Sequence, residues 1–230
     1  MNIPKLEEML KAGMHFGHRT NRWHPKMEPF IFTKKNGIYI INIEKTQEQI
    51  KKALEFMIKL RNEDKIILFV GTKKQVKASM KKMAEEIKSP YIVGKWLGGL
   101  VTNFAVIKKS IKKYQDLLND KESGKLGKYT KKEQLDFDRE TKRLEERVGG
   151  LVGLTRLPDA IFIWDLKEEK TAVAEAISKN IPIIAVCDTN VNPELADYPI
   201  PANDDATKTV ELLLNCIKDN LLNAKNIQLK

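Results

Sequence analysis

The sequence predicts a doubly wound α/β domain, built on a parallel sheet and interrupted by an inserted helical hairpin. Two observations predict this fold. An apolar, β-branched run followed by a polar turn and a helical pattern recurs along the chain, which is typical of strands buried between helical layers. Residues 102–149 break that pattern with two narrow apolar stripes in otherwise charged segments, as in an antiparallel coiled coil. A chain of 230 residues is long enough for one large domain and such an appendage.

The predicted elements of the α/β part follow in order. We expect strands at residues 38–43, 66–70, 160–164 and 183–187, and helices at residues 44–60, 73–87, 166–177 and 205–222. Residues 198–201 are expected to form a short edge strand, because Pro199 and Pro201 exclude a central position in a sheet.

The predicted hairpin has one apolar stripe on each helix. Glycine pairs at residues 98–99 and 149–150 bracket it, as expected where a chain leaves and rejoins a domain. So polar an arm is expected to be solvated or pressed against a charged partner. The stripes consist of Phe104, Ile107, Ile111, Tyr114 and Leu118 on the first helix, and Phe137, Leu144 and Val148 on the second.

These patterns divide the chain into five parts. They are an N-terminal helix with a basic and aromatic arm (1–37), the first part of the α/β domain (38–101), the coiled-coil insertion (102–149), the second part of the α/β domain (150–224) and a short tail (225–230).

The charge of the chain favours a polyanionic partner. The net charge is +10, but residues 61–150 hold 22 Lys and Arg against 13 Asp and Glu, whereas residues 151–230 hold 8 against 12. The partner is therefore expected to contact the first two thirds. The N-terminus lacks the apolar core of a secretory signal, and no apolar run approaches the roughly 20 residues of a membrane span. Cys187 and Cys216 are expected to be buried thiols, so the predicted compartment is the cytoplasm.

The arm between His15 and Lys35 has the composition of an RNA contact. Arginine forks match phosphate oxygens, and aromatic rings offer faces to unpaired bases. Arg19, Arg22 and Lys26 alternate there with Trp23 and His24. The alternative is a loop packed on the sheet and anchored by Trp23 and Phe30, and both can hold at once.

A second candidate site is a divalent-ion site at the carboxyl ends of the strands, where parallel strands converge. Asp188 ends one strand, and Asp204 and Asp205 follow the last one. One or two of these carboxylates together with His18 are predicted to meet there and to hold magnesium or zinc. The alternative is that Asp204 or Asp205 caps the last helix. No other cofactor is expected.

The turn at residues 71–75 joins a strand to a helix and resembles a phosphate cradle. It matches neither the Walker pattern nor the dinucleotide fingerprint, so we expect Lys73 and Lys74 to clasp an RNA phosphate instead. No catalytic residues are predicted, because the chain lacks a Gly-x-Ser-x-Gly elbow and neither cysteine has a basic neighbour.

Eight segments, in order and across the whole chain, together resemble the bacterial small-subunit ribosomal protein S2 family. They are AGMHFGH (12–18), RWHPKM (22–27), NGIYII (36–41), FVGTKKQ (69–75), WLGGLVTNF (96–104), LPDA (157–160), DTN (188–190) and IPANDDA (200–206).

The resemblance implies a flavodoxin-like parallel sheet with an inserted coiled coil. It implies a structural role in the small (30S) ribosomal subunit, between head and body, bound to 16S-type rRNA. It also implies docking of neighbouring proteins, including the large OB-repeat protein that captures messenger RNA. Lys95 stands where the family commonly has arginine. The predicted RNA-binding residues are Arg19, Arg22, Trp23, His24, Lys26, Lys73, Lys74, Lys95, Trp96, Asn103, Lys108 and Lys112, and the predicted metal ligands are His18, Asp188 and Asp204.

Two alternatives belong to other functional classes. A flavodoxin-like nucleotide-binding enzyme would use the strand-end edge of the sheet. A membrane-surface protein is disfavoured, because no basic helix carries a wide apolar face.

Overall fold

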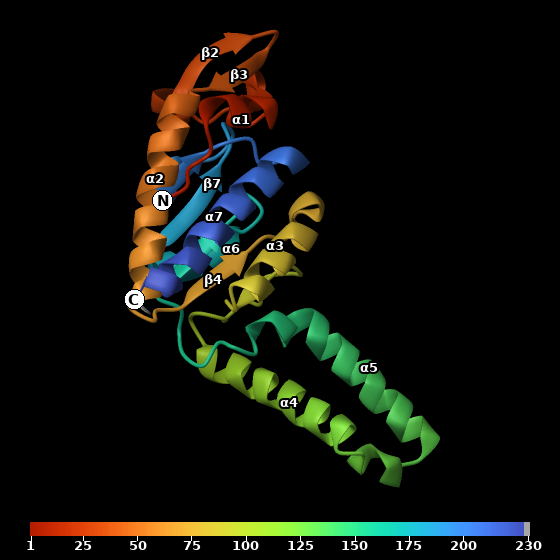
Figure 1. The fold of residues 1–230 in the computed structure, drawn as a ribbon. Helices are drawn as coiled ribbons and strands as arrows, with labels where there is room; N and C mark the ends of the chain where they lie inside the picture. The colour runs from red at the N-terminus through yellow and green to blue at the C-terminus, as the bar shows by residue number, and fades with distance from the viewer. Residues whose placement is uncertain (228–230) are drawn as a thin grey trace.

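The computed structural model describes residues 1–227, together with the side chains of all of these except 126–127 and 225–227 (Figure 1). Its centre is a parallel sheet with the strand order β5-β4-β6-β7-β8. Counted along the parallel strands, this is the flavodoxin-like order 2-1-3-4-5, whose switch point lies between β4 and β6. The proline-containing strand β8 lies at one edge, as predicted. The strands are β4 (Ile67–Val70), β5 (Tyr91–Ile92), β6 (Ala160–Ile163), β7 (Ile183–Cys187) and β8 (Tyr198–Pro201).

Helices cover both faces of this sheet. Side chains alternate along each strand, so Phe69 and Phe162 face one layer while Leu68 and Ile161 face the other. The first layer contains α2 (Ile43–Asn62), α3 (Lys74–Glu86) and α7 (Thr207–Ile227). The second contains α6 (Lys170–Ser178) and the base of the inserted hairpin. The predicted doubly wound architecture is thus confirmed.

The N-terminal region differs from the prediction. After α1 (Leu6–Lys11), the strands β1 (Phe16–Arg19), β2 (Ile31–Lys35) and β3 (Ile38–Ile41) form a separate antiparallel sheet, and short 3-10 turns lie at Thr20–Arg22 and Pro25–Phe30. The expectation that residues 38–43 belong to the parallel sheet is wrong, because β3 pairs on both sides with strands of the arm. Asn36 and Gly37, with φ of 51° and 75°, close the β2–β3 turn. The boundary predicted after residue 37 therefore falls inside a β-hairpin.

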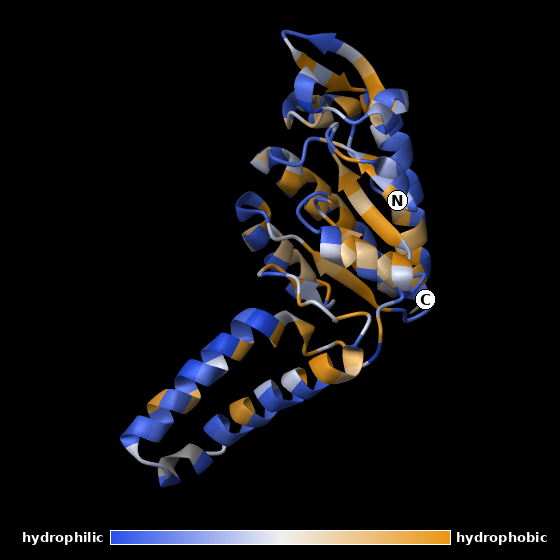
Figure 2. Cartoon of the chain, turned by 180° about the vertical axis from the view of Figure 1, so that it is seen from behind, coloured by the Kyte–Doolittle hydropathy of each residue, from blue (hydrophilic) through white to orange (hydrophobic). Residues whose placement is uncertain are grey.

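The inserted hairpin projects from the opposite end of the molecule (Figure 1). It consists of α4 (Phe104–Glu122), a 3-10 turn (Lys125–Lys128) and α5 (Lys131–Val148). Both helices are largely hydrophilic (Figure 2). Farther from the sheet, Lys113 pairs with Glu140 at 2.9 Å and Lys121 with Asp138 at 2.7 Å. The pairing of two antiparallel helices is present, whereas their supercoiling stays a prediction.

The base of the hairpin is less solvated than its composition suggests. Ile107, Ile111 and Tyr114 from α4 join Leu144 and Val148 from α5 in the core on the second face of the sheet. The expectation of a wholly solvated or partner-covered arm holds only for its outer half.

Three smaller predictions can be compared with the described residues. Cys187 and Cys216 are both buried and form no disulfide. Helix α7 continues to Ile227, so the predicted tail begins as helix, and residues 228–230 lie outside the described part. Within that part, no helix has the length and apolar character needed to cross a membrane.

Candidate nucleic-acid interface and the acidic cluster beside it

The carboxyl ends of the parallel strands bring together a cluster of carboxylates around Lys73. The Lys73 Nζ atom lies 2.9 Å from Asp165 Oδ2, 2.8 Å from Asp204 Oδ2 and 2.9 Å from Asp205 Oδ1. Its side chain is only 16% exposed. Lys73 does not fit the predicted role of clasping an RNA phosphate, since three carboxylates hold its ammonium and would repel a further anion. The neighbouring Lys74 is exposed.

This cluster occupies the place where doubly wound proteins commonly bind ligands. At the switch point, the Thr72 hydroxyl donates a hydrogen bond to Glu169, which is itself buried. Burial raises the pKa of Glu169. An edge lined by Glu169 and four aspartates is electrostatically unfavourable for the phosphates of a nucleotide, which weighs against the nucleotide-binding alternative.

The N-terminal arm docks onto the same strand ends. His18 Nδ1 lies 3.1 Å from Asp188 Oδ1, and the His18 backbone N–H donates to Thr189 Oγ1 at 2.8 Å. The His24 backbone N–H donates to the Thr189 carbonyl at 2.7 Å. A Cβ atom at Gly17 would lie 2.5 Å from Thr189 Cγ2, so only glycine allows this close approach. The arm is therefore held against the sheet and is not a free tail.

Burial and charge shift the titration of this cluster. Burial and the nearby Asp188 raise the pKa of Asp204 to about 7. The hydrogen bond to Asp188 raises the pKa of His18. Burial opposes a charged Lys73, but Asp204 and the other carboxylates raise its pKa nevertheless. Among the described residues, Asp204 Oδ1 is buried without a hydrogen-bond partner.

The predicted metal ligands do come together. One ligand atom each from His18, Asp188 and Asp204 lies within 4.8 Å of the others. The alternative role of Asp204 or Asp205 was to cap the last helix, but both carboxylates face Lys73. The backbone N–H groups of residues 205 and 206, just before α7, donate instead to Asn203 Oδ1. An acidic pair with one imidazole is a donor set that suits a divalent cation.

Most of the predicted RNA-binding cations are exposed and uncompensated. Six of them, named at the end of this paragraph, form no ion pair or hydrogen bond among the described side chains. Lys26, in contrast, pairs with Glu194 at 2.8 Å. Asn103 is exposed at the start of α4. The six are Arg19, Arg22, Lys74, Lys95, Lys108 and Lys112.

Trp23 and His24, both predicted to contact RNA, make contacts within the N-terminal region. The Trp23 ring lies 5.0 Å from that of Tyr39, centroid to centroid, and is half-buried. His24 Nδ1 accepts a hydrogen bond from the Lys26 backbone at 3.2 Å. One side of Trp23 is therefore packed, as in the anchoring alternative. The exposed side of the ring remains available for a base.

Trp96 has a structural role that differs from the predicted one. It is buried, and its Nε1 donates to Glu175 Oε1 at 3.0 Å. Glu175 also accepts from the backbone N–H groups of Gly99, Val101 and Thr102 at 2.8, 3.0 and 3.1 Å, and from the Thr102 hydroxyl at 3.1 Å. Although burial opposes it, these donors lower the pKa of Glu175.

Glu175 was missed in the sequence, although a signal existed. It lies in α6 among Ala172, Val173 and Ala176, which are buried, so a carboxylate there needs donors from another segment. Those donors come from the loop that leads into α4. Glu175 thereby holds this loop against α6.

Comparison with known proteins identifies the family of the chain. A family model described as ribosomal protein S2 matches residues 9–224. The chain is 43% identical over 225 residues to the small ribosomal subunit protein uS2 of Coprothermobacter proteolyticus, covering 98% of this chain and 84% of that protein. It is 46% identical over 224 residues to the uS2 protein of Chloroherpeton thalassium, covering 97% and 90%. Both relatives are named as proteins of the small ribosomal subunit, and neither is named as an enzyme. The chain therefore belongs to the ribosomal protein S2 family, with a structural role in the small subunit.

Proposed function

We propose that this chain binds small-subunit rRNA between the head and body of the subunit, by phosphate contacts from its exposed cations. The observation that carries this proposal is the state of Arg19 and Arg22. Both are exposed and, in the described part of the chain, neither is paired with a carboxylate. They stand on an arm that the contacts of His18 and Thr189 hold in place. Unpaired guanidinium groups on a backbone that is held in place are well suited to phosphate.

The cations occupy two separate regions. Arg19 and Arg22 lie in the N-terminal sheet region, whereas Lys108 and Lys112 lie on the hairpin at the other end of the molecule (Figure 1). Such a spacing favours a protein that bridges two parts of a folded RNA. Recognition would follow RNA shape, since phosphates position a protein without identifying a sequence.

The test is the salt dependence of binding to full-length small-subunit rRNA. Arg19→Ala/Arg22→Ala should weaken binding, and it should reduce the steepness of log K against log salt by about 2 if both phosphate contacts are lost. Lys51→Ala/Lys52→Ala is the charge-matched control, because these lysines are exposed on α2 and were not predicted to bind RNA.

Equal losses in the two double variants would indicate that only net charge matters, and the assignment to the arm would then be wrong. Binding of the unchanged chain that is insensitive to salt would contradict the proposal as a whole.

We further propose that His18, Asp188 and Asp204 hold a divalent cation. The supporting observation is Asp204 Oδ1, a buried carboxylate oxygen without a hydrogen-bond partner among the described residues, in a cluster where carboxylates outnumber cations. The imidazole nitrogen favours zinc over magnesium. A bound ion would join the arm, through His18, to the ends of β7 and β8.

Equilibrium dialysis of the full chain against zinc and against magnesium tests this site. We expect about one zinc ion per chain, with affinity lowered at least about tenfold in His18→Ala and in Asp188→Asn. His24→Ala is the matched control, since His24 lies on the same arm outside the cluster. Identical zinc binding by the His18 and His24 variants would rule out the site.

We also propose that the surface around Phe32 docks a protein neighbour, the large OB-repeat protein that captures messenger RNA. Phe32 is 71% exposed and Leu10 50% exposed. They line a hollow of about 310 Å³ together with His15 and Ile40. Exposed aromatic surface beside a hollow is typical of protein interfaces.

Co-sedimentation of that protein with small subunits containing Phe32→Ala tests the docking surface. We expect reduced recovery of the OB-repeat protein and unchanged recovery of the chain itself. Leu195→Ala, at another exposed apolar position, should change neither. Unchanged recovery with Phe32→Ala would remove this surface from consideration.

A further inference from the structure

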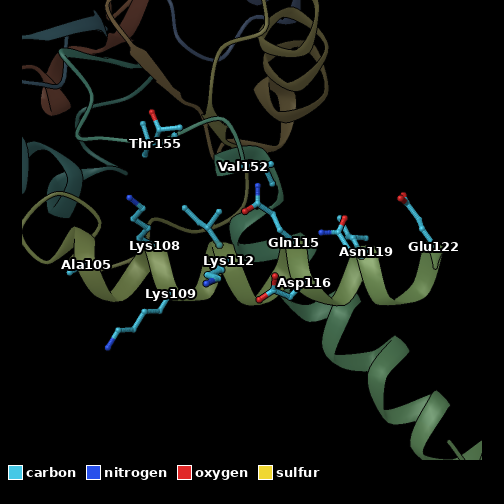
Figure 3. A pocket seen from close by; sticks show the side chains of 13 residues that line it. Ala105, Lys108, Lys109, Lys112, Gln115, Asp116, Asn119, Glu122, Val152 and Thr155 are labelled. Carbon is cyan, nitrogen blue, oxygen red and sulfur yellow. The ribbon is translucent and has the colours of Figure 1, made fainter. Parts of the chain in front are cut away.

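A groove runs between helix α4 and the segment 152–155 that follows the hairpin (Figure 3). Its volume is about 920 Å³. Val152, Leu154 and Thr155 form one wall, and Ile111 and Leu118 contribute apolar surface from the helix. The groove follows α4 from Ala105 to Glu122, and its inner end lies where Ile107 and Ile111 anchor the helix in the core.

The α4 side of the groove carries an ordered row of polar groups. Lys108, Lys112, Gln115 and Asn119 follow one another at steps of four, three and four residues, so they share one face of the helix. In Figure 3, Lys108 and Gln115 point toward the segment that carries Val152 and Thr155. In the described part of the chain, none of these four side chains forms a hydrogen bond or ion pair, and all retain their donors.

We propose that this groove binds an unpaired nucleotide of the small-subunit rRNA. Lys108 and Lys112 contact the phosphates on either side, and the amides of Gln115 and Asn119 bond the edge of the base. Val152, 37% exposed, contributes the apolar surface on which the base lies. Amides recognise base edges because they offer a donor and an acceptor side by side. This inference rests on the proposed rRNA binding and names one nucleotide subsite within it.

The charge of the groove favours a nucleotide over an apolar protein segment as its occupant. Lys108 and Lys112 are exposed and have no counter-ion in the described part of the chain, so an anionic occupant is favoured. The apolar surface of Val152 and Leu118 is then left for the base. A base needs only one flat contact and hydrogen bonds at its edge. Lys109, also unpaired and exposed, adds to the positive charge at the same end of the groove.

The charge along the groove sets the direction of the RNA. Its cations are concentrated at residues 108–112, whereas Asp116 and Glu122 lie farther along α4 toward the tip. A phosphate backbone is therefore expected to cross α4 near its base and not to follow the helix outward. The base then enters beside Gln115 and Asn119.

Binding and footprinting on full-length small-subunit rRNA, with the full chain, test the subsite. Gln115→Ala/Asn119→Ala removes both amides without a change of charge. We expect binding to weaken about tenfold with the salt slope unchanged, and one or two unpaired nucleotides to lose protection from reagents that modify base edges. Lys108→Ala/Lys112→Ala should instead lower the steepness of the salt slope by about 1.4, two single-strand phosphate contacts.

Asn215→Ala is the amide control, because Asn215 is exposed on α7, in the layer on the other face of the sheet. An amide double variant with the affinity and footprint of the unchanged chain would overturn the subsite while leaving rRNA binding intact. Loss of rRNA binding by the unchanged chain would overturn the proposed function itself. A crosslink from position 152 in assembled subunits that reaches a protein and no nucleotide would also overturn the subsite.

Discussion

Two buried carboxylates, Glu175 at the base of the hairpin and Asp204 at the ends of the strands, have opposite surroundings. Glu175 accepts five hydrogen bonds from Trp96 and the loop of residues 99–102. Asp204 Oδ2 lies 2.8 Å from the Lys73 ammonium, whereas Asp204 Oδ1 has no hydrogen-bond partner among the described residues. The pKa is accordingly lowered at Glu175 and raised at Asp204.

The two carboxylates therefore suit different roles: Glu175 stabilises the fold, whereas Asp204 is available to a ligand. A buried charge is stable when donors satisfy all of its lone pairs, and it then defines the geometry around it. Glu175 is in that state, and it orders the loop from which α4 begins. Asp204 keeps unused capacity beside two further ligand groups, His18 and Asp188. The first site is therefore expected to resist change, and the second to respond to ions and pH.

The largest effect is expected from Glu175→Ala. Removing the carboxylate leaves the Trp96 indole and three backbone N–H groups without their acceptor, so stability should fall by about 3 kcal/mol. Urea unfolding followed by circular dichroism measures this loss.

Glu175→Gln is the matched variant. Its amide oxygen still accepts two or three of the bonds, so it should lose less than half as much. Equal losses in the alanine and glutamine variants would show that the packing of the side chain matters and its five hydrogen bonds do not.

A smaller effect is expected from Lys73→Met, which keeps the packing of the side chain and removes its charge. Asp165, Asp204 and Asp205 then lose their shared cation, and the variant should be less stable by about 2 kcal/mol at pH 7.5. The unfolding free energy of the purified chain in chelator measures this.

Added zinc gives a second test of the role of the Lys73 charge. An added divalent ion should recover part of the stability of Lys73→Met, because it supplies the missing positive charge. Lys74→Met, whose ammonium is exposed and unpaired in the described structure, should change stability by less than about 0.5 kcal/mol. A similar loss from both variants would contradict the role assigned to Lys73.

The smallest effect is a dependence of stability on pH. Because the pKa of Asp204 is about 7 when folded and near 3.8 when unfolded, the folded chain holds an additional proton between these values. The stability from that proton is complete below about pH 4 and is lost as the pH rises toward 7. The raised pKa of His18 acts in the same direction near pH 6.5 and above.

In chelator, the free energy of unfolding should therefore fall between pH 5 and pH 7 and level off by pH 8. Asp204→Asn should flatten most of this slope, whereas Glu55→Gln, on the exposed side of α2, should retain it. Glu175 contributes the opposite sign, since its lowered pKa gives stability that is lost only as the pH falls below about 4.5. A slope that is unchanged in Asp204→Asn would place the titrating group elsewhere.

Sequence periodicity was sufficient to identify the strands that are completely buried. The strands at residues 67–70, 160–163 and 183–187 are buried along their whole length, so continuous apolar runs identified them. It failed at residues 38–41, where β3 has a similar apolar composition but lies half-exposed in a different sheet. Composition alone does not reveal which partner a strand pairs with. The signal here was the Asn36-Gly37 turn, which joins β2 and β3 in a hairpin.

The candidate site was predictable to the same extent. Convergence of strand ends predicted that His18, Asp188 and Asp204 meet, and they do. The sequence could not show that Lys73 turns inward to three carboxylates, or that Trp96 turns inward to Glu175. An isolated basic or aromatic residue has the same composition whether it faces solvent or the core.

By itself, the sequence determined the doubly wound architecture, the inserted helical pair, the uneven charge and the family, because these follow from periodicity and from motifs in order. Only the tertiary structure decided which charged side chains are paired inside the protein and which remain exposed and unpaired. That division depends on contacts between residues far apart in the chain, such as the 132 positions that separate Lys73 from Asp205. Arg19, Arg22, Lys108 and Lys112 remain exposed and unpaired in the described structure because no carboxylate is folded against them.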